Sequence, residues 1–282
     1  MTTLPTTHPT TVLYEVSDHI ATLTLNRPDR LNAYTAALGA ELRQAMRRAS
    51  DDADVRVIIL TGAGRGFCAG ADMDTLNGIQ GQARDGGNVN EAATGNGPWD
   101  ANTSPDYQMA HSYFPAVPKP IIAAINGACA GLGLVYALFC DVRFAAAGAK
   151  FTTAFSRRGL IAEHGISVTL PRLVGLSKAL DLLMSARVVQ AEEALRLGMV
   201  DHVVAPAELM AAARAYAKDM ADNVSPRSMA VIKQQIWAAD QLSMRANIEV
   251  ANQAMLASFA SEDFKEGVAH FVQKRPAAFT GR

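Results

Sequence analysis

Two glycine-rich turns, each following a short apolar run, carry the clearest chemical signal in the sequence. The apolar residues 121–125 precede a turn over 126–133, after which a second apolar run has the length of a helix. The apolar residues 55–60 precede a similar turn over 62–72. Glycines before a helix let a ligand approach the backbone, and N–H groups in the first helical turn have no partner inside the helix. Two such turns can each offer one N–H group to a single oxygen, which would form an oxyanion hole.

A carboxyl group in an apolar setting is the second chemical signal. Glu163 lies in the sequence Leu-Ile-Ala-Glu-His-Gly at residues 160–165, where burial should raise the pKa of a carboxyl group toward neutrality. Such a base could move a proton on a carbon next to a carbonyl group. Alternatively, Glu163 is a carboxylate that complements the dipole at a helix N-terminus. The adjacent His164 either assists Glu163 as a second acid or base, or is a packed neighbour.

Three other kinds of site are disfavoured by their sequence context. Cys129 could pair with His164 as a nucleophile, but apolar surroundings raise the pKa of a thiol and no orienting partner is visible. Cys68 and Cys140 have the context of small core residues. Residues 64–69 match the pattern G-x-G-x-x-A, but the acidic residue that a dinucleotide site needs would fall in a Gly/Asn-rich stretch. No Gly-Lys-Ser/Thr follows the glycines, so a P-loop is excluded.

Length and composition indicate an ordinary globular protein. The 282 residues, 49% hydrophobic and 19% charged, predict one large domain or one domain with a helical appendage. A net charge of −1 argues against nucleic acid or an anionic membrane as a partner. No apolar run reaches the roughly 18 residues of a membrane span, and the N-terminus lacks the features of a secretory signal. Because three cysteines in such a chain suggest free thiols, we expect a cytoplasmic protein.

The elements that would position the chemical groups alternate between strands and helices. Residues 12–16 and 20–25 predict a hairpin, and apolar spacing predicts a helix over 35–49. Residues 55–60 and 142–146 predict further strands. This alternation predicts an α/β fold with a mostly parallel sheet built of βα units.

The rest of the chain divides by composition. Residues 1–10 predict a disordered tail, and residues 78–104, rich in Gly, Asn, Ala and Asp, predict a mobile loop. That loop is either a lid over the substrate or an inert insertion. Within a core over 11–205, Ser177 is expected to cap one helix, and another over 191–197 is expected to end at Gly198. The part over 206–282 is expected to be helical, with helix starts at Pro206, Ser225 and Ser261.

Four segments match the signatures of one protein family. They are Asn26-Arg27-Pro28 with Asn32-Ala33, Phe67 through Asp72, Asn126-Gly127 through Gly133, and Phe271 to Phe279. On these segments the chain resembles the crotonase, or enoyl-CoA hydratase/isomerase, family from about residue 12 onward. The resemblance implies an α/β crotonase fold, a spiral of ββα units whose C-terminal helical part mediates contacts within a homotrimer or a dimer of trimers. It also implies that the backbone N–H groups of Ala71 and Leu132 hold a thioester enolate.

The same resemblance implies an acyl-CoA thioester as the substrate, with no metal and no tightly bound cofactor. The path of the adenine and pantetheine would be lined, largely by backbone groups, by Asn32, Ala33, Ala69, Gly70 and Asp72. Three basic residues either contact the phosphates or are solvated surface charges: Arg30, Lys274 and Arg275.

The sequence departs from the hydratases of this family at two positions. Hydratases use two glutamates, and the matching positions hold Val135 and Phe155. Peroxisomal-type Δ3,Δ2-enoyl-CoA isomerases carry a single glutamate at the position of Glu163 and a non-glycine residue at that of Leu132. Because double-bond migration needs only one base, the resemblance favours such an isomerase. The alternatives are a hydratase that uses Glu163 with His164, or a catalytically weak acyl-CoA binding protein.

Overall fold

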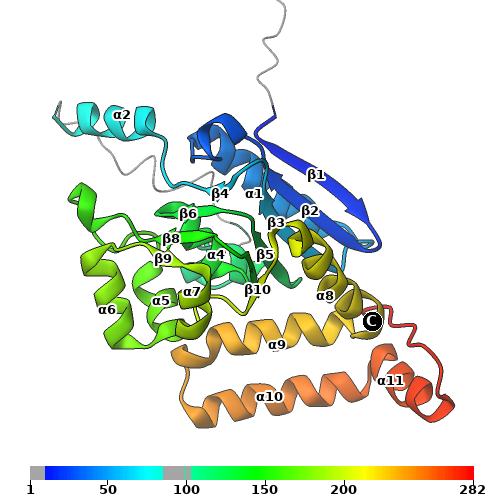
Figure 1. Cartoon of the computed structure of the whole chain (residues 1–282). Coiled ribbons are helices and arrows are strands. Elements are labelled where there is room, and N and C mark those ends of the chain that lie inside the picture. Colours follow the sequence, from blue (N-terminus) through cyan, green and yellow to red (C-terminus); the bar gives the residue numbers. More distant parts are fainter. Residues whose placement is uncertain (1–9, 85–98, 100–102) are drawn as a thin grey trace, which may run out of the picture.

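A computed structural model describes residues 10–84, 99 and 103–282 of the chain (Figure 1). The strands are β1 Val12–Ser17, β2 Ile20–Leu25, β3 Val57–Gly62, β4 Gly66–Cys68, β5 Ile121–Ile125, β6 Ala128–Ala130, β7 Val142–Ala146, β8 Lys150–Thr152, β9 Val189–Gln190 and β10 His202–Val204. The helices are α1 Ala36–Asp51, α2 Met73–Arg84, α4 Leu132–Phe139, α5 Ile166–Val174, α6 Leu176–Ser185, α7 Ala191–Leu197, α8 Leu209–Asn223, α9 Pro226–Ala238, α10 Met244–Phe259 and α11 Glu262–Gln273.

The strands form two sheets. The larger sheet has the order β1-β2-β3-β5-β7-β10, in which β1 and β2 form an antiparallel hairpin and the later pairs are parallel. The smaller sheet has the order β4-β6-β8-β9. Strand β5 is buried at every position, which explains its unbroken apolar sequence. The predicted hairpin and the mostly parallel α/β fold are therefore confirmed.

Helices cover both faces of the larger sheet. Because side chains alternate along a strand, Ile58 and Leu60 of β3 share one cluster of buried side chains with α1, while Val57 and Ile59 share another with α8. Helix α1 begins at the cap residue Thr35, whose side chain accepts a hydrogen bond from the N–H of Leu38. Its buried residues are those that the helical spacing predicts: Leu38, Leu42, Ala45, Met46 and Ala49.

The prediction of a loop over residues 78–104 is wrong at its start. Residues 78–84 continue α2, because Gly78 and Gly81 inside the helix each cost only about 1 kcal/mol and do not end it. Trp99 is buried and stacks on Tyr113, with the Arg47 guanidinium 4.2 Å from the centroid of its ring. The remainder of that prediction, 85–98 and 100–102, and residues 1–9 of the predicted tail lie outside the described residues.

Some of the helix caps predicted in the second half of the chain are confirmed, and others are wrong or were missed. Ser225 and Ser261 cap α9 and α11 through their side chains, as expected. Ser177 does not cap α6, because the turn at Gly175 starts that helix at Leu176. The cap of α10, Ser243, was not predicted. None of the helices in the described parts combines the length and the hydropathy that crossing a membrane requires.

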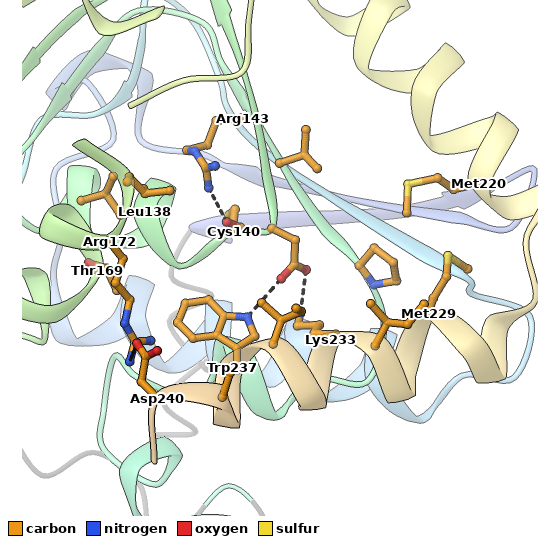
Figure 2. A pocket seen from close by; sticks show the side chains of 17 residues that line it. Leu138, Cys140, Arg143, Thr169, Arg172, Met220, Met229, Lys233, Trp237 and Asp240 are labelled. Carbon is orange, nitrogen blue, oxygen red and sulfur yellow. Dashed lines mark hydrogen bonds and ion pairs between the residues drawn. The ribbon is translucent and has the colours of Figure 1, made fainter. Parts of the chain in front are cut away.

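A buried ion pair attaches α9 to the larger sheet (Figure 2). Asp141 accepts hydrogen bonds from Nζ of Lys233 at 2.8 Å, from Nε1 of Trp237 at 3.4 Å and from the N–H of Ile121 at 2.7 Å. Asp141, Lys233 and Trp237 line a largely apolar hollow of about 710 Å³ between α9 and the core. The hollow is separate from both glycine turns, none of whose residues line it.

Replacement of Lys233 by methionine is expected to lower the free energy of unfolding by about 3 kcal/mol, because it leaves Asp141 without its cation in a partly buried site. The side chains of Lys233 and Asp141 are only 5% and 21% exposed. Arg245→Met is the matched control, since Arg245 and its partner Glu249 are 88% and 58% exposed and such a pair contributes less than about 1 kcal/mol. Urea unfolding at one protein concentration measures both, and equal losses would contradict the prediction.

Candidate active site

The hydrogen bonds of the neighbouring peptide groups determine the direction of the N–H group of Ala71. The N–H of Tyr34 donates to the carbonyl of Gly70 at 2.7 Å, and the N–H of Asp72 donates to the carbonyl of Tyr34 at 2.9 Å. These two bonds use the peptide groups on either side of Ala71, so its own N–H points away from Tyr34. Within the described residues, no acceptor for this N–H is found.

Leu132 is the first residue of α4, a position where an N–H group has no acceptor inside the helix. The first bond inside this helix runs from the N–H of Val135 to the carbonyl of Gly131, at 3.1 Å. Gly131 has a φ of +51°, which favours glycine, and its own N–H donates to the carbonyl of Thr152. For Leu132, too, the described part of the chain supplies no acceptor.

The two turns lie against each other. A Cβ atom placed on Gly70 would be 3.0 Å from the carbonyl oxygen of Ala130 and 3.7 Å from Cα of Gly131. A Cβ atom on Gly133 would collide with the backbone carbonyl of Cys68. The glycines therefore allow the close contact between the turns of Ala71 and Leu132.

Buried side chains hold the first of these turns in place. The Asn32 side chain is fully buried, donates to the carbonyls of Ala63 and Gly66, and accepts from the N–H of Arg27 at 2.8 Å. The carboxylate of Asp72 pairs with Arg27 at 2.9 Å. Burial opposes ionisation of Asp72, but the hydrogen bond from the N–H of Asp74 and the Arg27 guanidinium outweigh it and lower its pKa.

These internal hydrogen bonds limit which groups along the predicted coenzyme A path can contact a ligand. The side chains of Asn32 and Asp72 are engaged inside the protein, and so are their N–H groups, which donate to the carbonyls of Arg27 and Tyr34. Ala33 is also buried, and the N–H of Ala69 donates to the carbonyl of Leu31. Among the basic residues considered for phosphates, Arg275 forms two hydrogen bonds with Glu266.

Glu163 and His164 lie in the turn before α5. The Glu163 side chain is 28% exposed, and burial raises its pKa above the ordinary value of a glutamate. Proximity of a helix N-terminus would lower that pKa, so burial is the dominant influence. Nε2 of His164 lies 3.5 Å from Oε2 of Glu163, and burial lowers the pKa of this imidazole. The pair therefore offers one carboxyl group suited to proton transfer beside a neutral histidine.

Ring contacts connect this pair to the two glycine turns. The His164 ring lies 4.6 Å from that of His111, and His111 lies 5.3 Å from Tyr34, the residue that pairs with the turn of Ala71. His111 also contacts Tyr136 of α4. The sequence analysis missed this cluster, because nothing in its residue spacing marks His111 as a neighbour of residues 25 to 77 positions away.

The two positions that carry glutamates in hydratases are apolar and buried. Val135 is inaccessible to solvent and Phe155 is 6% exposed. The Phe155 ring lies 4.0 Å from where a Cβ atom on Gly131 would stand, which places it beside the second turn. Glu163 is therefore the candidate base that the geometry retains.

The cysteines do not offer a nucleophile. All three are free and buried. Burial raises the pKa of Cys68 to about 11 and that of Cys129 well above the ordinary thiol value, so both stay protonated near neutral pH. No group of His, Cys, Asp or Glu side chains within the described ranges is arranged to hold a metal ion.

Known proteins are similar to this chain over almost its whole length. A family model described as enoyl-CoA hydratase/isomerase matches residues 15–282. The 1,2-epoxyphenylacetyl-CoA isomerase of Escherichia coli is 34% identical, with 96% of this chain and 98% of the relative covered. The (E)-benzylidenesuccinyl-CoA hydratase of Thauera aromatica is also 34% identical, with 96% and 99% covered. A solved structure of an enoyl-CoA hydratase from Bacillus anthracis, 29% identical, superposes with a TM-score of 0.82 over 96% of this chain and 100% of that chain.

Proposed function

We propose, from the premise that this chain belongs to the crotonase, or enoyl-CoA hydratase/isomerase, family, that it is a Δ3,Δ2-enoyl-CoA isomerase with Glu163 as its only base. The observation that carries the proposal is that Glu163 is the single carboxyl group with a raised pKa in the described part of the chain, while apolar Val135 and Phe155 fill the two positions of the hydratase glutamates. Proteins of this family act on acyl-CoA thioesters, so the fold and the substrate class agree with this chemistry.

The proposed reaction needs one base and one oxyanion hole. The N–H groups of Ala71 and Leu132 donate hydrogen bonds to the thioester oxygen of a 3-enoyl-CoA. The Glu163 carboxylate removes a proton from C2, and the electron pair of that C–H bond delocalises into a dienolate. The dienolate then takes the same proton from Glu163 at C4, and the double bond comes to lie between C2 and C3. Glu163 returns to its ionised form, so the cycle needs no co-reactant.

Hydration is the second candidate function, and the contact between Glu163 and His164 favours it. Addition of water needs one group to activate the water and another to manage the α-proton. His164 lies 3.5 Å from Glu163 and could be the second group. The relatives include both a hydratase and an isomerase by name, and the two names describe acyl groups that contain a phenyl ring or an epoxidised phenyl ring.

A side-by-side assay tests the proposal. The purified protein is given a 3-enoyl-CoA and a 2-enoyl-CoA, each with an alkyl and with an aryl substituent. Isomerisation of the 3-enoyl thioester with negligible hydration of the 2-enoyl thioester is the expected result. Strong hydration would support the second candidate, and tight binding without turnover would show an acyl-CoA binding protein instead.

The pH dependence of isomerisation follows from the pKa of Glu163. The base must be ionised, so kcat/KM is expected to fall as the pH is lowered through this pKa. Because burial raises the pKa, the fall should begin at a higher pH than for an exposed glutamate. Burial lowers the pKa of His164, so any change from this imidazole is expected below the ordinary range of a histidine. A profile measured within the pH range of thermal stability checks this, and an acidic limb at the ordinary glutamate value would contradict it.

We further propose a homotrimer or a dimer of trimers, a cytoplasmic location with reduced thiols, and no tightly bound cofactor. Exposed apolar side chains on α9 and α10 support contacts between copies, since such surfaces seldom stay in water. They include Ile232, Ile236, Met244, Ile248 and Leu256.

A further inference from the structure

His111 lies between the elements that carry the candidate catalytic groups, although the proposed reaction does not use it. Its side chain is almost completely buried, with only 6% of the residue exposed. Nδ1 of His111 lies 3.0 Å from the hydroxyl oxygen of Tyr136. The His111 ring meets the rings of His164 and Tyr34 edge-on, at centroid distances of 4.6 and 5.3 Å.

Each of these three neighbours belongs to a different part of the site. Tyr136 is one helical turn after Leu132 in α4. The backbone of Tyr34 forms both hydrogen bonds that orient the peptide groups around Ala71. His164 directly follows Glu163. One ring therefore contacts the supports of both N–H donors and of the base.

The charge state of His111 argues against a role as an acid or base. Burial, together with the nearby His164 and Arg43, lowers its pKa to about 3, so the ring is neutral near neutral pH. Tyr34 and Tyr136, whose pKa values burial raises, are the other titratable groups that face it and are also uncharged. In a neutral imidazole Nδ1 is either a donor or an acceptor, and in both tautomers it can pair with the hydroxyl of Tyr136.

The backbone conformation of His164 needs support from its surroundings, which the contact with His111 can supply. His164 has a φ of +56°, a conformation that non-glycine residues seldom adopt unless their surroundings hold them there. The His111 ring packs against its side chain. Movement of His164 would carry with it the adjacent Glu163, whose carboxylate must lie within reach of a specific carbon.

We propose that His111 is a positioning residue. Held by Tyr136, its ring fixes His164 and, through it, the Glu163 carboxyl group relative to the N–H groups of Ala71 and Leu132. The kinetic consequence of this inference rests on the proposed isomerase function, whereas the structural consequence does not.

Kinetics of His111→Phe, Tyr136→Phe and the double variant test the inference. Each change removes the hydrogen bond but keeps an aromatic ring, and thermal unfolding verifies that each variant folds. We expect kcat to fall about 10- to 100-fold with KM nearly unchanged. The kcat of the double variant should be no lower than that of the single variant with the lower kcat. The acidic limb of the pH profile should remain, because Glu163 is still the base. Wild-type kcat, a loss confined to KM, or additive losses would overturn the inference.

A second measurement does not depend on activity. The ring Cε1–Hε1 NMR signal of His164, assigned from its absence in His164→Gln, is compared between wild type and Tyr136→Phe. Because His111 would no longer be fixed, its ring current on His164 should change and the signal should shift. An unshifted signal would overturn the inference. If the wild-type protein converts no thioester, the proposed function fails, and the shift alone decides whether His111 has this role.

Discussion

Glu163→Gln is expected to lower kcat for isomerisation by about 10²- to 10⁴-fold and to leave KM nearly unchanged. The amide has the shape of the carboxyl group but cannot accept the C2 proton. Burial gives the carboxyl group its raised pKa, and no other carboxyl group replaces it at the positions of Val135 and Phe155. Initial rates on a 3-enoyl-CoA, measured with wild type and variant at one pH above the acidic limb, check this expectation.

Glu192→Gln is the matched control for this experiment. Glu192 is exposed in the first turn of α7, so the same chemical change there should leave kcat as it is. Binding of the product thioester to Glu163→Gln, followed by calorimetry, should match that of wild type, because the oxyanion donors remain. If isomerisation survives in Glu163→Gln, another group is the base, and His164 is the first to replace.

Much of the fold was predictable because buried positions hold apolar residues, and their spacing along the sequence differs between strands and helices. Strands buried on both faces, such as β5, have continuous apolar sequences, and α1 shows apolar residues at helical spacing. The positions of glycines were less informative about where helices and strands begin and end. Glycine ended or began elements at Gly175 and Gly198, but Gly78 and Gly81 lie inside α2.

The candidate site was predictable where backbone geometry alone defines it. Glycine spacing marks both turns, because only a residue without Cβ allows Gly70 to lie against the turn of Gly131. The side chains that brace the site left no such signal. Asn32 was predicted to line a ligand path largely through backbone groups, and nothing in the sequence indicated that its amide donates to backbone carbonyls of residues more than 30 positions away. His111 likewise gains its neighbours only through tertiary packing.

Leu132→Pro is expected to lower kcat by about 10²- to 10³-fold, the usual effect of removing one oxyanion-hole donor. Proline lacks the N–H group but suits the first position of a helix, where that N–H has no partner within the helix. Leu132 is at this position in α4, and the preceding Gly131 has no Cβ to clash with a proline ring. The variant should therefore keep its fold and lose a single hydrogen-bond donor.

Leu132→Ala separates the backbone from the side chain in this experiment. It removes most of the same buried side chain but keeps the N–H, so its kcat should stay within a few-fold of wild type while its thermal stability falls. Rates and unfolding temperatures of both variants are measured together. Equal losses of kcat in the two would mean that the Leu132 side chain, and not its N–H, matters. A large loss in Leu132→Pro alone, with both proteins folded, would mean that α4 presents its first N–H group to the thioester oxygen, since the two variants differ there in little but that donor.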